Sequence, residues 1–173
     1  MYLKMALLPI IVAPDPRLKV KCGNVKAVTD DVRQFMDDML ETMYDAPGIG
    51  LAAPQVGVKT RIIVVDVSKN QNGNQPYKMI NPEIIWRSDQ VVDYEEGCLS
   101  LPDQYAQVKR PDEIHLQYID PDGAEQHLET SGILATCIQH EIDHLDGKLF
   151  VDHISKIRRD LIIRKLKKYK AAS

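Results

Sequence analysis

The chain has 173 residues, of which 44% are hydrophobic and 27% charged, and this composition excludes a disordered or fibrous protein. The formal net charge of -3 gives no overall indication of nucleic-acid binding, and no apolar stretch is long enough to cross a membrane. Three scattered cysteines favour a reducing compartment over a disulfide framework. Residues 1–173 are therefore predicted to form a single globular domain.

A short apolar run at residues 6–13 could be mistaken for the core of a secretion signal. However, Pro9 interrupts this run, and Pro14, Asp15 and Pro16 follow in place of a small-residue cleavage site. We therefore expect a buried extended segment here, in a cytoplasmic protein.

A first helix is predicted between Thr29 and Pro47. Thr29 is suited to cap its start, the acidic Asp30 and Asp31 suit the positive end of the helix dipole, and Pro47–Gly48 ends it. Apolar side chains recur at helical spacing and should face the core: Val32, Phe35, Met36, Met39, Leu40 and Met43.

The pattern then becomes that of β-strands, with short β-branched or alternating runs between polar segments. A polar loop is expected at 70–75, and the turn sequence Asp120–Gly123 closes the last strand. Four segments are predicted as strands: 61–67, 79–86, 91–94 and 113–120.

Two further helices are predicted, from Ile133 to Leu145 and from Ser155 to Tyr169. Strands grouped between helices indicate an α+β fold. In this fold mostly antiparallel sheets surround the central helix 133–145, with an N-terminal helix and a basic C-terminal helix at 155–170. The apolar side of the C-terminal helix should comprise Ile157, Leu161, Ile162 and Leu166.

The helix 133–145 carries the run His140-Glu141-Ile142-Asp143-His144. Residues four apart lie on one helix face, so His140 and His144 can bind one metal ion. Glu141 then lies beside the metal, where it can move the proton of a bound water. The alternative interpretation is an amphipathic helix with two ordinary histidines.

A catalytic metal usually has three protein ligands and one open position, so a third ligand is needed. Metallopeptidase patterns place that ligand downstream of the histidines. Here no glutamate follows Glu141, and Phe150 stands where an extended motif requires another histidine. His153 remains a downstream candidate.

Two upstream cysteines are further candidates. Cys137 precedes His144 by seven residues, about 10 Å along the helix axis, which is too far for its short side chain. We expect Cys137 to pack beneath the site. Cys98 follows a strand and Gly97, which allows the backbone to come close. Spacing slightly favours Cys98, although buried structural thiols are the commoner case for both.

Three segments together resemble the signature motifs of the peptide deformylase family, with matching order and spacing, and the likeness covers nearly the whole chain. It implies a hydrolase that acts on N-formylmethionyl nascent peptides during translation and releases formate. The segments are Gly48-Ile49-Gly50-Leu51-Ala52-Ala53-Pro54-Gln55, Glu96-Gly97-Cys98-Leu99-Ser100 and Gln139-His140-Glu141-Ile142-Asp143-His144.

The resemblance implies one divalent metal with water at its fourth position. A mixed thiolate and imidazole set suits zinc and ferrous iron. Fe(II) is typical of the family, and Zn(II) or Ni(II) can take its place. The implied ligands are Cys98, His140 and His144.

The resemblance also assigns the chemical steps. Water activated by the metal would attack the formyl carbon, with Glu141 as the general base and then the general acid. The side-chain amide of Gln55 and the backbone N–H of Leu99 would donate to the oxyanion, and the Gly50 backbone would bind the first peptide amide.

Methionine recognition requires an apolar slot, because a flexible thioether is held by contact area. Ile49, Ile133 and Cys137 are the candidates, although each could equally be a core residue. Tyr105 stands where many bacterial family members carry an arginine, so no charge-based grip on the substrate is expected there. The full set expected at the substrate is Ile49, Gly50, Glu96, Gly97, Leu99, Ile133 and Cys137.

The segment from Lys156 to Lys170 contains eight Lys or Arg residues and one acidic residue, Asp160. A solvated helix surface is the usual explanation for such a run. The alternative, which the family resemblance favours, is docking on ribosomal RNA.

Two other classes of function compete with a deformylase. A metallopeptidase that cleaves internal peptide bonds would lack its downstream ligand in this chain. A structural metal site would need a fourth protein ligand, for which only Cys22 or His153 could be suggested.

Overall fold

A computed structural model describes residues 6–68 and 73–173 of the chain. The predicted loop at 70–75 lies partly outside the described residues. No helix in the described part of the chain is long and apolar enough to span a membrane.

The larger of two β-sheets has five strands in the order β1-β2-β3-β6-β7, and all neighbours are antiparallel. Strand β2 lies inside this sheet and is buried on both faces, which explains its uninterrupted apolar sequence. The strands are β1 (Gly50–Ala52), β2 (Ile62–Val65), β3 (Tyr77–Arg87), β6 (Glu113–Ile119) and β7 (Glu125–Ser131).

The second sheet is a long antiparallel hairpin of β4 (Val91–Cys98) and β5 (Leu101–Pro111). An irregularity in the pairing between Glu96 and Cys98 breaks the regular register just before the turn. Cys98 therefore sits at the end of a strand, where a local kink can direct its side chain.

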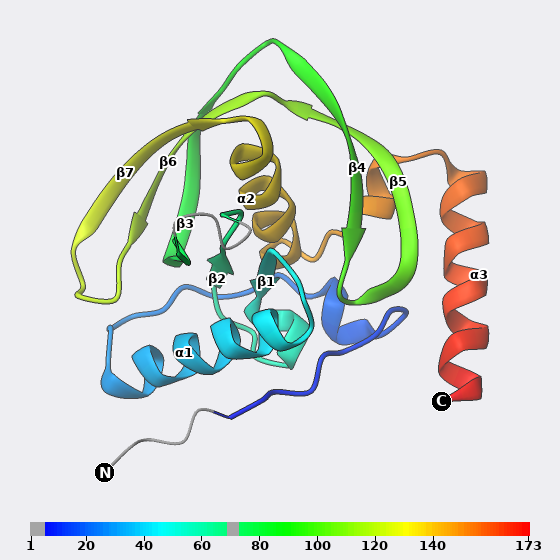
Figure 1. The fold of residues 1–173 in the computed structure, drawn as a ribbon, viewed down its shortest axis with the longest axis horizontal. Coiled ribbons are helices and arrows are strands. Elements are labelled where there is room, and N and C mark those ends of the chain that lie inside the picture. The colour runs from blue at the N-terminus through cyan, green and yellow to red at the C-terminus, as the bar shows by residue number, and fades with distance from the viewer. Residues whose placement is uncertain (1–5, 69–72) are drawn as a thin grey trace.

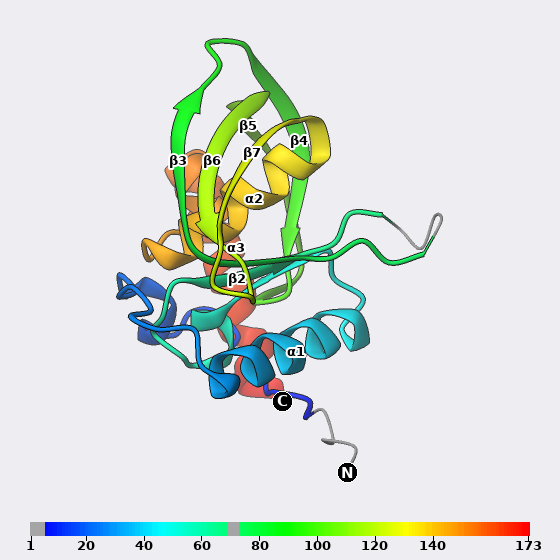
Figure 2. The ribbon, with the colours of Figure 1, turned by 90° about the vertical axis from the view of Figure 1, so that its left-hand side faces the viewer.

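Three α-helices complete the fold: α1 (Asp30–Asp45), α2 (Gly132–Leu145) and α3 (Lys156–Ala172). Three short 3-10 helices connect other segments: η1 (Pro16–Lys19), η2 (Ala53–Val56) and η3 (Phe150–His153). Helix α2 lies between strands β3, β6 and β7 on one side and the β4–β5 hairpin on the other (Figure 1). Helix α1 lies below this arrangement, as the rotated view also shows (Figure 2).

Three apolar clusters hold these layers together. Ile63 and Val65 of β2 pack with α2, whereas Ile62 and Val64, on the opposite face of the same strand, pack with Met36, Met39 and Met43 of α1. The third cluster joins Ile162 and Leu166 of α3 to β5 and η3. Helix α2 is thus fixed from several sides, whereas α3 is attached along one side.

The predicted α+β fold, with antiparallel sheets around a central helix, is confirmed. The β5 and β7 strands were not predicted from the sequence. Strand β7 lies at the sheet edge and carries one apolar residue, Leu128, so it lacks an alternating apolar pattern. Strand β5 has prolines at its second and last positions, which are usually signals against a strand.

Two predictions about burial need correction. In the segment 6–13, Ile11 and Ala13 are buried, but Leu7 is 57% exposed, because the segment runs along the surface and forms no strand. On α3, Ile157 and Leu161 are 76% and 49% exposed, because the body of the protein contacts only a narrow side of that helix.

Candidate metal centre and active site

Three possible metal ligands converge at the centre of the molecule. Cys98, His140 and His144 each place one ligand atom within 4.8 Å of the other two. The Cys98 Sγ lies 3.4 Å from the Nε2 of His144. A tetrahedral site with a metal–sulfur bond of about 2.3 Å and metal–nitrogen bonds of about 2.0 Å sets these atoms about 3.5 Å apart. The observed separation therefore fits a bound metal.

Helix geometry brings the two histidines together. They lie four residues apart on α2, and their side chains occupy one face of that helix. Both are buried, at 8% and 1% exposure for His140 and His144. Their ligand atoms face the end of β4, from which Cys98 completes the group.

A chain of buried charges orients His140. The Nδ1 of His140 lies 2.8 Å from Glu96 Oε1, which leaves Nε2 for a metal. Arg110 donates two hydrogen bonds to the Glu96 carboxylate, at 2.6 and 2.9 Å, and a third to Asp143 at 2.8 Å. Burial acts to raise the pKa of Glu96, but the hydrogen bonds from His140 and Arg110 lower it. Glu96 is therefore a carboxylate that fixes the ring of a candidate ligand.

The two histidines differ in their tendency to ionise. Burial holds the pKa of His144 well below its usual range, so this ring is neutral and able to bind a metal. Burial acts in the same direction on His140, but hydrogen bonds to Cys98 and Glu96 raise its pKa well above the usual range. Because a metal at Nε2 would take the place of the proton on this ring, metal binding should release a proton.

Glu141 is 4% exposed and lines the same cavity as Cys98 and His140. Burial raises the pKa of its carboxyl group to about 7. Its Oε2 has no hydrogen-bond partner within the described residues. The carboxyl is therefore suited to exchange a proton with a ligand in the cavity near neutral pH.

Gly50 makes room for the Glu141 carboxylate. A side chain at residue 50 would collide with Glu141 Oε1 and would approach the Cys137 Sγ to 2.9 Å. The glycine-rich segment before η2 thus has no space for a Cβ at this point.

Gln55 is 1% exposed and its orientation is fixed from both sides. Its Oε1 accepts from the Ala52 backbone N–H at 2.9 Å. Its amide group donates to Ser100 Oγ at 3.1 Å and lies 3.5 Å from Cys98 Sγ. A polarised N–H is therefore held beside the candidate metal centre.

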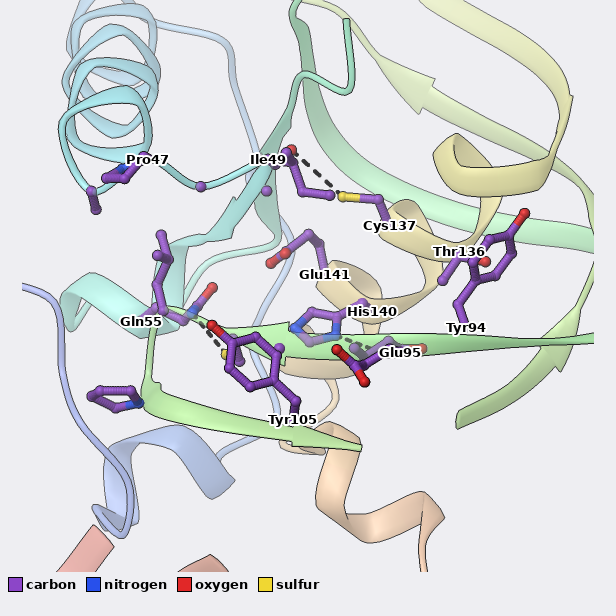
Figure 3. Close-up of a pocket in the computed structure, with 18 of the residues that line it drawn as sticks. Pro47, Ile49, Gln55, Tyr94, Glu95, Tyr105, Thr136, Cys137, His140 and Glu141 are labelled. Carbon is purple, nitrogen blue, oxygen red and sulfur yellow. Dashed lines mark hydrogen bonds and ion pairs between the residues drawn. The ribbon is translucent and has the colours of Figure 1, made fainter. Parts of the chain in front are cut away.

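These groups share a cavity of about 590 Å³ between α2, the β4–β5 hairpin and the loop before β1 (Figure 3). Of the sequence-predicted site residues, His144 alone is absent from its lining, because it lies behind the cavity wall at 1% exposure. The predicted residues that line the cavity are Ile49, Gly50, Gln55, Glu96, Gly97, Cys98, Leu99, Ile133, Cys137, His140 and Glu141.

Other candidate ligands lie elsewhere. Cys22 belongs to an apolar core cluster, and His153 lies 2.7 Å from Asp143 Oδ2 instead of reaching the metal centre. Cys137 contacts the Ile49 carbonyl at 3.5 Å, and burial raises its pKa well above the usual range. Within residues 6–68 and 73–173, the ligand group thus contains one thiol and two imidazoles.

Sequence reasoning missed Arg110 and Asp143 as parts of the site. Ala106, Val108 and Arg110 occupy alternate, buried positions of β5, so an arginine stands where an apolar residue is usual. The alternation of buried positions could have indicated that Arg110 points inward, but this can be recognised only once the segment is known to be a strand.

Comparison with known proteins agrees with this geometry. The sequence model of the polypeptide deformylase family matches residues 7–160. A peptide deformylase of Rhizobium meliloti is 52% identical over 164 residues, which cover 95% of this chain and 94% of the relative.

Solved structures of the family have the same fold as this chain. A peptide deformylase from Ehrlichia chaffeensis, in complex with actinonin, superposes with a TM-score of 0.90 at 42% identity, covering 95% of this chain and 98% of that one. A peptide deformylase from Legionella pneumophila gives a TM-score of 0.90 at 39% identity, covering 96% and 97%. The chain therefore belongs to the polypeptide deformylase family, hydrolases that remove the N-formyl group from nascent peptides.

Proposed function

We propose that this chain is a metal-dependent hydrolase that removes the formyl group from the initiator formylmethionine of nascent polypeptides and releases formate. The observation that carries the proposal is the meeting of three ligand atoms within 4.8 Å, with Glu141 beside them in one cavity. The family comparison supplies the substrate class.

Cys98, His140 and His144 would hold one divalent cation, and Fe(II) is favoured, with Zn(II) or Ni(II) as substitutes. When bound, such a cation lowers the pKa of a coordinated water and polarises the formyl oxygen. The Glu96 carboxylate holds His140 with Nε2 free for that role.

Glu141 would handle the proton. Its Oε2 has no hydrogen-bond partner among the described residues, and its pKa is about 7. Both features support transfer of a proton from water and its later delivery to the departing amine. The same group acts first as a base and then as an acid, so it ends each turnover as it began.

The developing oxyanion needs fixed donors. The Gln55 amide is buried and oriented by Ala52, and the backbone N–H of Leu99 directly follows Cys98. The Gly50 backbone would bind the first amide of the peptide, where the lack of a side chain leaves space. Glu96 and Gly97, on the opposite side, line the path of the peptide.

The methionine side chain would occupy the apolar wall formed by Ile49, Ile133 and Cys137. Ile49 and Ile133 are 40% and 43% exposed, so part of their apolar surface is open to a ligand in the cavity. Because related deformylases were solved in complex with actinonin, we also expect actinonin to bind in this cavity.

We further propose that residues 1–173 act as one domain in the cytoplasm and that α3 contacts the ribosome. All eight basic residues of α3 are exposed.

Deleting α3 would also expose the apolar cluster beneath Ile162 and Leu166, so substitution of Arg164, Lys167 and Lys168 by Gln is the cleaner test. Ribosome co-sedimentation should weaken in a salt-dependent way, with unchanged hydrolysis of free peptides. Unchanged co-sedimentation would refute the contact.

The enzymatic proposal is tested by formate release from a formyl-methionyl peptide. Protein purified without oxygen, stripped with a chelator and reloaded with Fe(II), Zn(II) or Ni(II) should release formate only when loaded. The Fe(II) form should lose activity in air, because a thiolate-bound ferrous ion oxidises. Cleavage of casein without formate release would instead indicate a metallopeptidase.

A further inference from the structure

One wall of the catalytic cavity is a short segment without regular secondary structure. Residues 46–49, here called the wall segment, connect the end of α1 to the start of β1, and all of them line the cavity. Pro47 and Ile49 of this segment stand at the edge of the cavity in the close-up (Figure 3). Connecting segments are more mobile than the elements that they join, so specific contacts are needed to fix this wall.

The wall segment packs beside groups that are expected to act in the reaction. A Cβ at Gly48 would come within 2.7 Å of the side chain of Leu99, whose backbone N–H should donate to the oxyanion. Gly50 follows the segment directly, and a Cβ there would collide with Glu141. A shift of the wall segment would therefore displace the backbone that should bind the peptide.

Asp66, the residue directly after β2, contacts the chain at both ends of the wall segment. Its backbone N–H donates to the Ile49 carbonyl at 2.9 Å. Its side-chain Oδ2 accepts a hydrogen bond from Tyr44 Oη, on the last turn of α1. Asp66 is 5% exposed, so these contacts are shielded from water. One buried residue thus connects the start of the segment to its end.

The Asp66 carboxylate is itself fixed in orientation. Its Oδ1 accepts from the Ser68 backbone N–H at 2.9 Å and from Ser68 Oγ at 2.6 Å, which leaves Oδ2 to Tyr44. Burial acts to raise the pKa of Asp66, but the hydrogen bonds from Ser68 and Tyr44 lower it. The contact between Tyr44 and Asp66 is therefore a charge-assisted hydrogen bond, which is stronger than a neutral one.

Two other polar contacts of the wall segment do not replace this connection. The Gly48 N–H donates to the Met43 carbonyl at 2.8 Å, a bond that stays at the end of α1. The Cys137 Sγ lies 3.5 Å from the Ile49 carbonyl, and a thiol is a weak donor. Neither contact connects α1 to Ile49.

We propose that Tyr44 and Asp66 are positioning residues of the active site, which hold the wall segment in the conformation that binds the peptide backbone. This role rests on the proposed deformylase function. Neither residue lines the cavity, so both would act through the wall segment. Without their hydrogen bond the free enzyme should populate conformations with the segment displaced, and the apparent affinity for substrate falls with the fraction of molecules that can bind it.

Tyr44→Phe tests this role because it removes the hydroxyl and keeps the ring. In the metal-loaded protein, KM for a formyl-methionyl-alanyl-serine peptide should rise about tenfold, the size of effect expected for a hydrogen bond to a charged group. The value of kcat should stay within about twofold, because bound substrate restores the position of the segment. Steady-state formate release measures both constants, and the metal content should equal that of the parent.

Hydrogen exchange of the Asp66 amide measures the position of the wall segment without turnover, because this N–H donates to the Ile49 carbonyl. In Tyr44→Phe the exchange of this amide should become about tenfold faster. The amides of β2 (Ile62–Val65) should exchange as in the parent, because a local opening leaves the sheet intact.

Two substitutions of Asp66 and one control locate the effect. Asp66→Asn should keep KM within about threefold of the parent, because its amide group can still accept from Ser68 and can donate to the Tyr44 hydroxyl. Asp66→Ala should raise KM at least as much as Tyr44→Phe does. The matched control Tyr118→Phe changes a partly buried tyrosine of β6 outside the cavity, and it should alter neither KM nor the exchange of the Asp66 amide.

Parent values of KM and of Asp66 exchange in Tyr44→Phe would overturn the proposed role. So would equally faster exchange throughout β2, which indicates a general loss of stability, or a lower kcat at constant KM. Absence of formate release by the parent protein would instead refute the proposed function, and the exchange of the Asp66 amide would still decide whether Tyr44 holds the wall segment.

Discussion

Helices α2 and α3 have similar lengths and both carry many polar side chains, but α2 is mostly buried whereas α3 is mostly exposed to solvent. Ten of the 14 residues of α2 are buried, whereas in α3 two of 17 are, Ile162 and Leu166. Polar groups on α2 must therefore form hydrogen bonds or ion pairs with other protein groups or with a ligand, whereas water can hydrogen-bond those on α3. The candidate catalytic groups of this protein lie where polar groups are buried, and burial together with the hydrogen bonds made there shifts their pKa values.

The largest effect in this comparison should come from the buried acid of α2. Glu141→Gln should lower kcat by about a thousandfold, because general acid–base catalysis contributes about 10²- to 10⁴-fold. Steady-state formate release measures the loss, and metal analysis should still find one ion per chain. The counterpart on α3, Asp160→Asn, is exposed and should retain full activity. Normal turnover by Glu141→Gln would remove the catalytic assignment.

Breaking the charge network behind α2 should affect both stability and metal binding. Arg110→Met leaves the buried Glu96 carboxylate without its guanidinium partner and leaves Asp143 with His153 alone, which should destabilise the fold by about 3–5 kcal/mol. Loss of the support for His140 should weaken metal binding by about 10- to 100-fold. Urea unfolding and chelator competition measure these effects. A metal affinity equal to that of the parent would show that the network does not orient His140.

The few buried residues of α3 should still contribute to its attachment. Leu166→Ala should lower the free energy of unfolding by about 2–5 kcal/mol, because it empties a closed apolar cluster. Ile157→Ala, at a position 76% exposed on the same helix, should change it by less than about 0.5 kcal/mol. Similar losses for both variants would contradict the one-sided packing of α3.

The pH dependence of stability should also differ between variants of the buried acid of α2 and of the exposed acid of α3. Burial raises the pKa of Glu141 from 4.5 to about 7, so the folded metal-free protein holds more protons there than the unfolded chain does. The contribution of Glu141 to stability should therefore fall as the pH rises from 4.5 through 7, by up to about 3 kcal/mol. Metal-free Glu141→Gln should show a flatter profile in urea unfolding across this range. Asp160→Asn should keep the parent's profile, and an identical slope for Glu141→Gln would exclude the shift.

The sequence predicted the helices well because their periodicity is strong. Met36, Met39 and Met43 recur on one face of α1, Thr29 caps its start, and the helix ends at Asp45, just before Pro47. Strand β2 was found from its β-branched run, although its observed limits are narrower than predicted. The edge strand β7 could not be predicted, because it buries too few apolar side chains to produce the alternating sequence pattern of a strand.

The site was predictable only in part for a related reason. His140, Glu141 and His144 follow from helical spacing, whereas Cys98 comes from β4, 42 residues earlier in the chain, and spacing alone left it open. Arg110 escaped detection because its role depends on the inward side of a strand that was not predicted. Contacts between distant segments carry little local sequence signal, and a family resemblance was needed to connect them.

X-ray absorption spectroscopy of the metal-loaded protein tests the central claim most directly. We expect a metal bound by one sulfur at about 2.3 Å and two imidazole nitrogens at about 2.0 Å, with a lighter atom completing the shell. Cys98→Ser should remove the sulfur signal. A metal shell without sulfur in the unaltered protein, or one that keeps its sulfur in that variant, would contradict a metal site ligated by Cys98, His140 and His144.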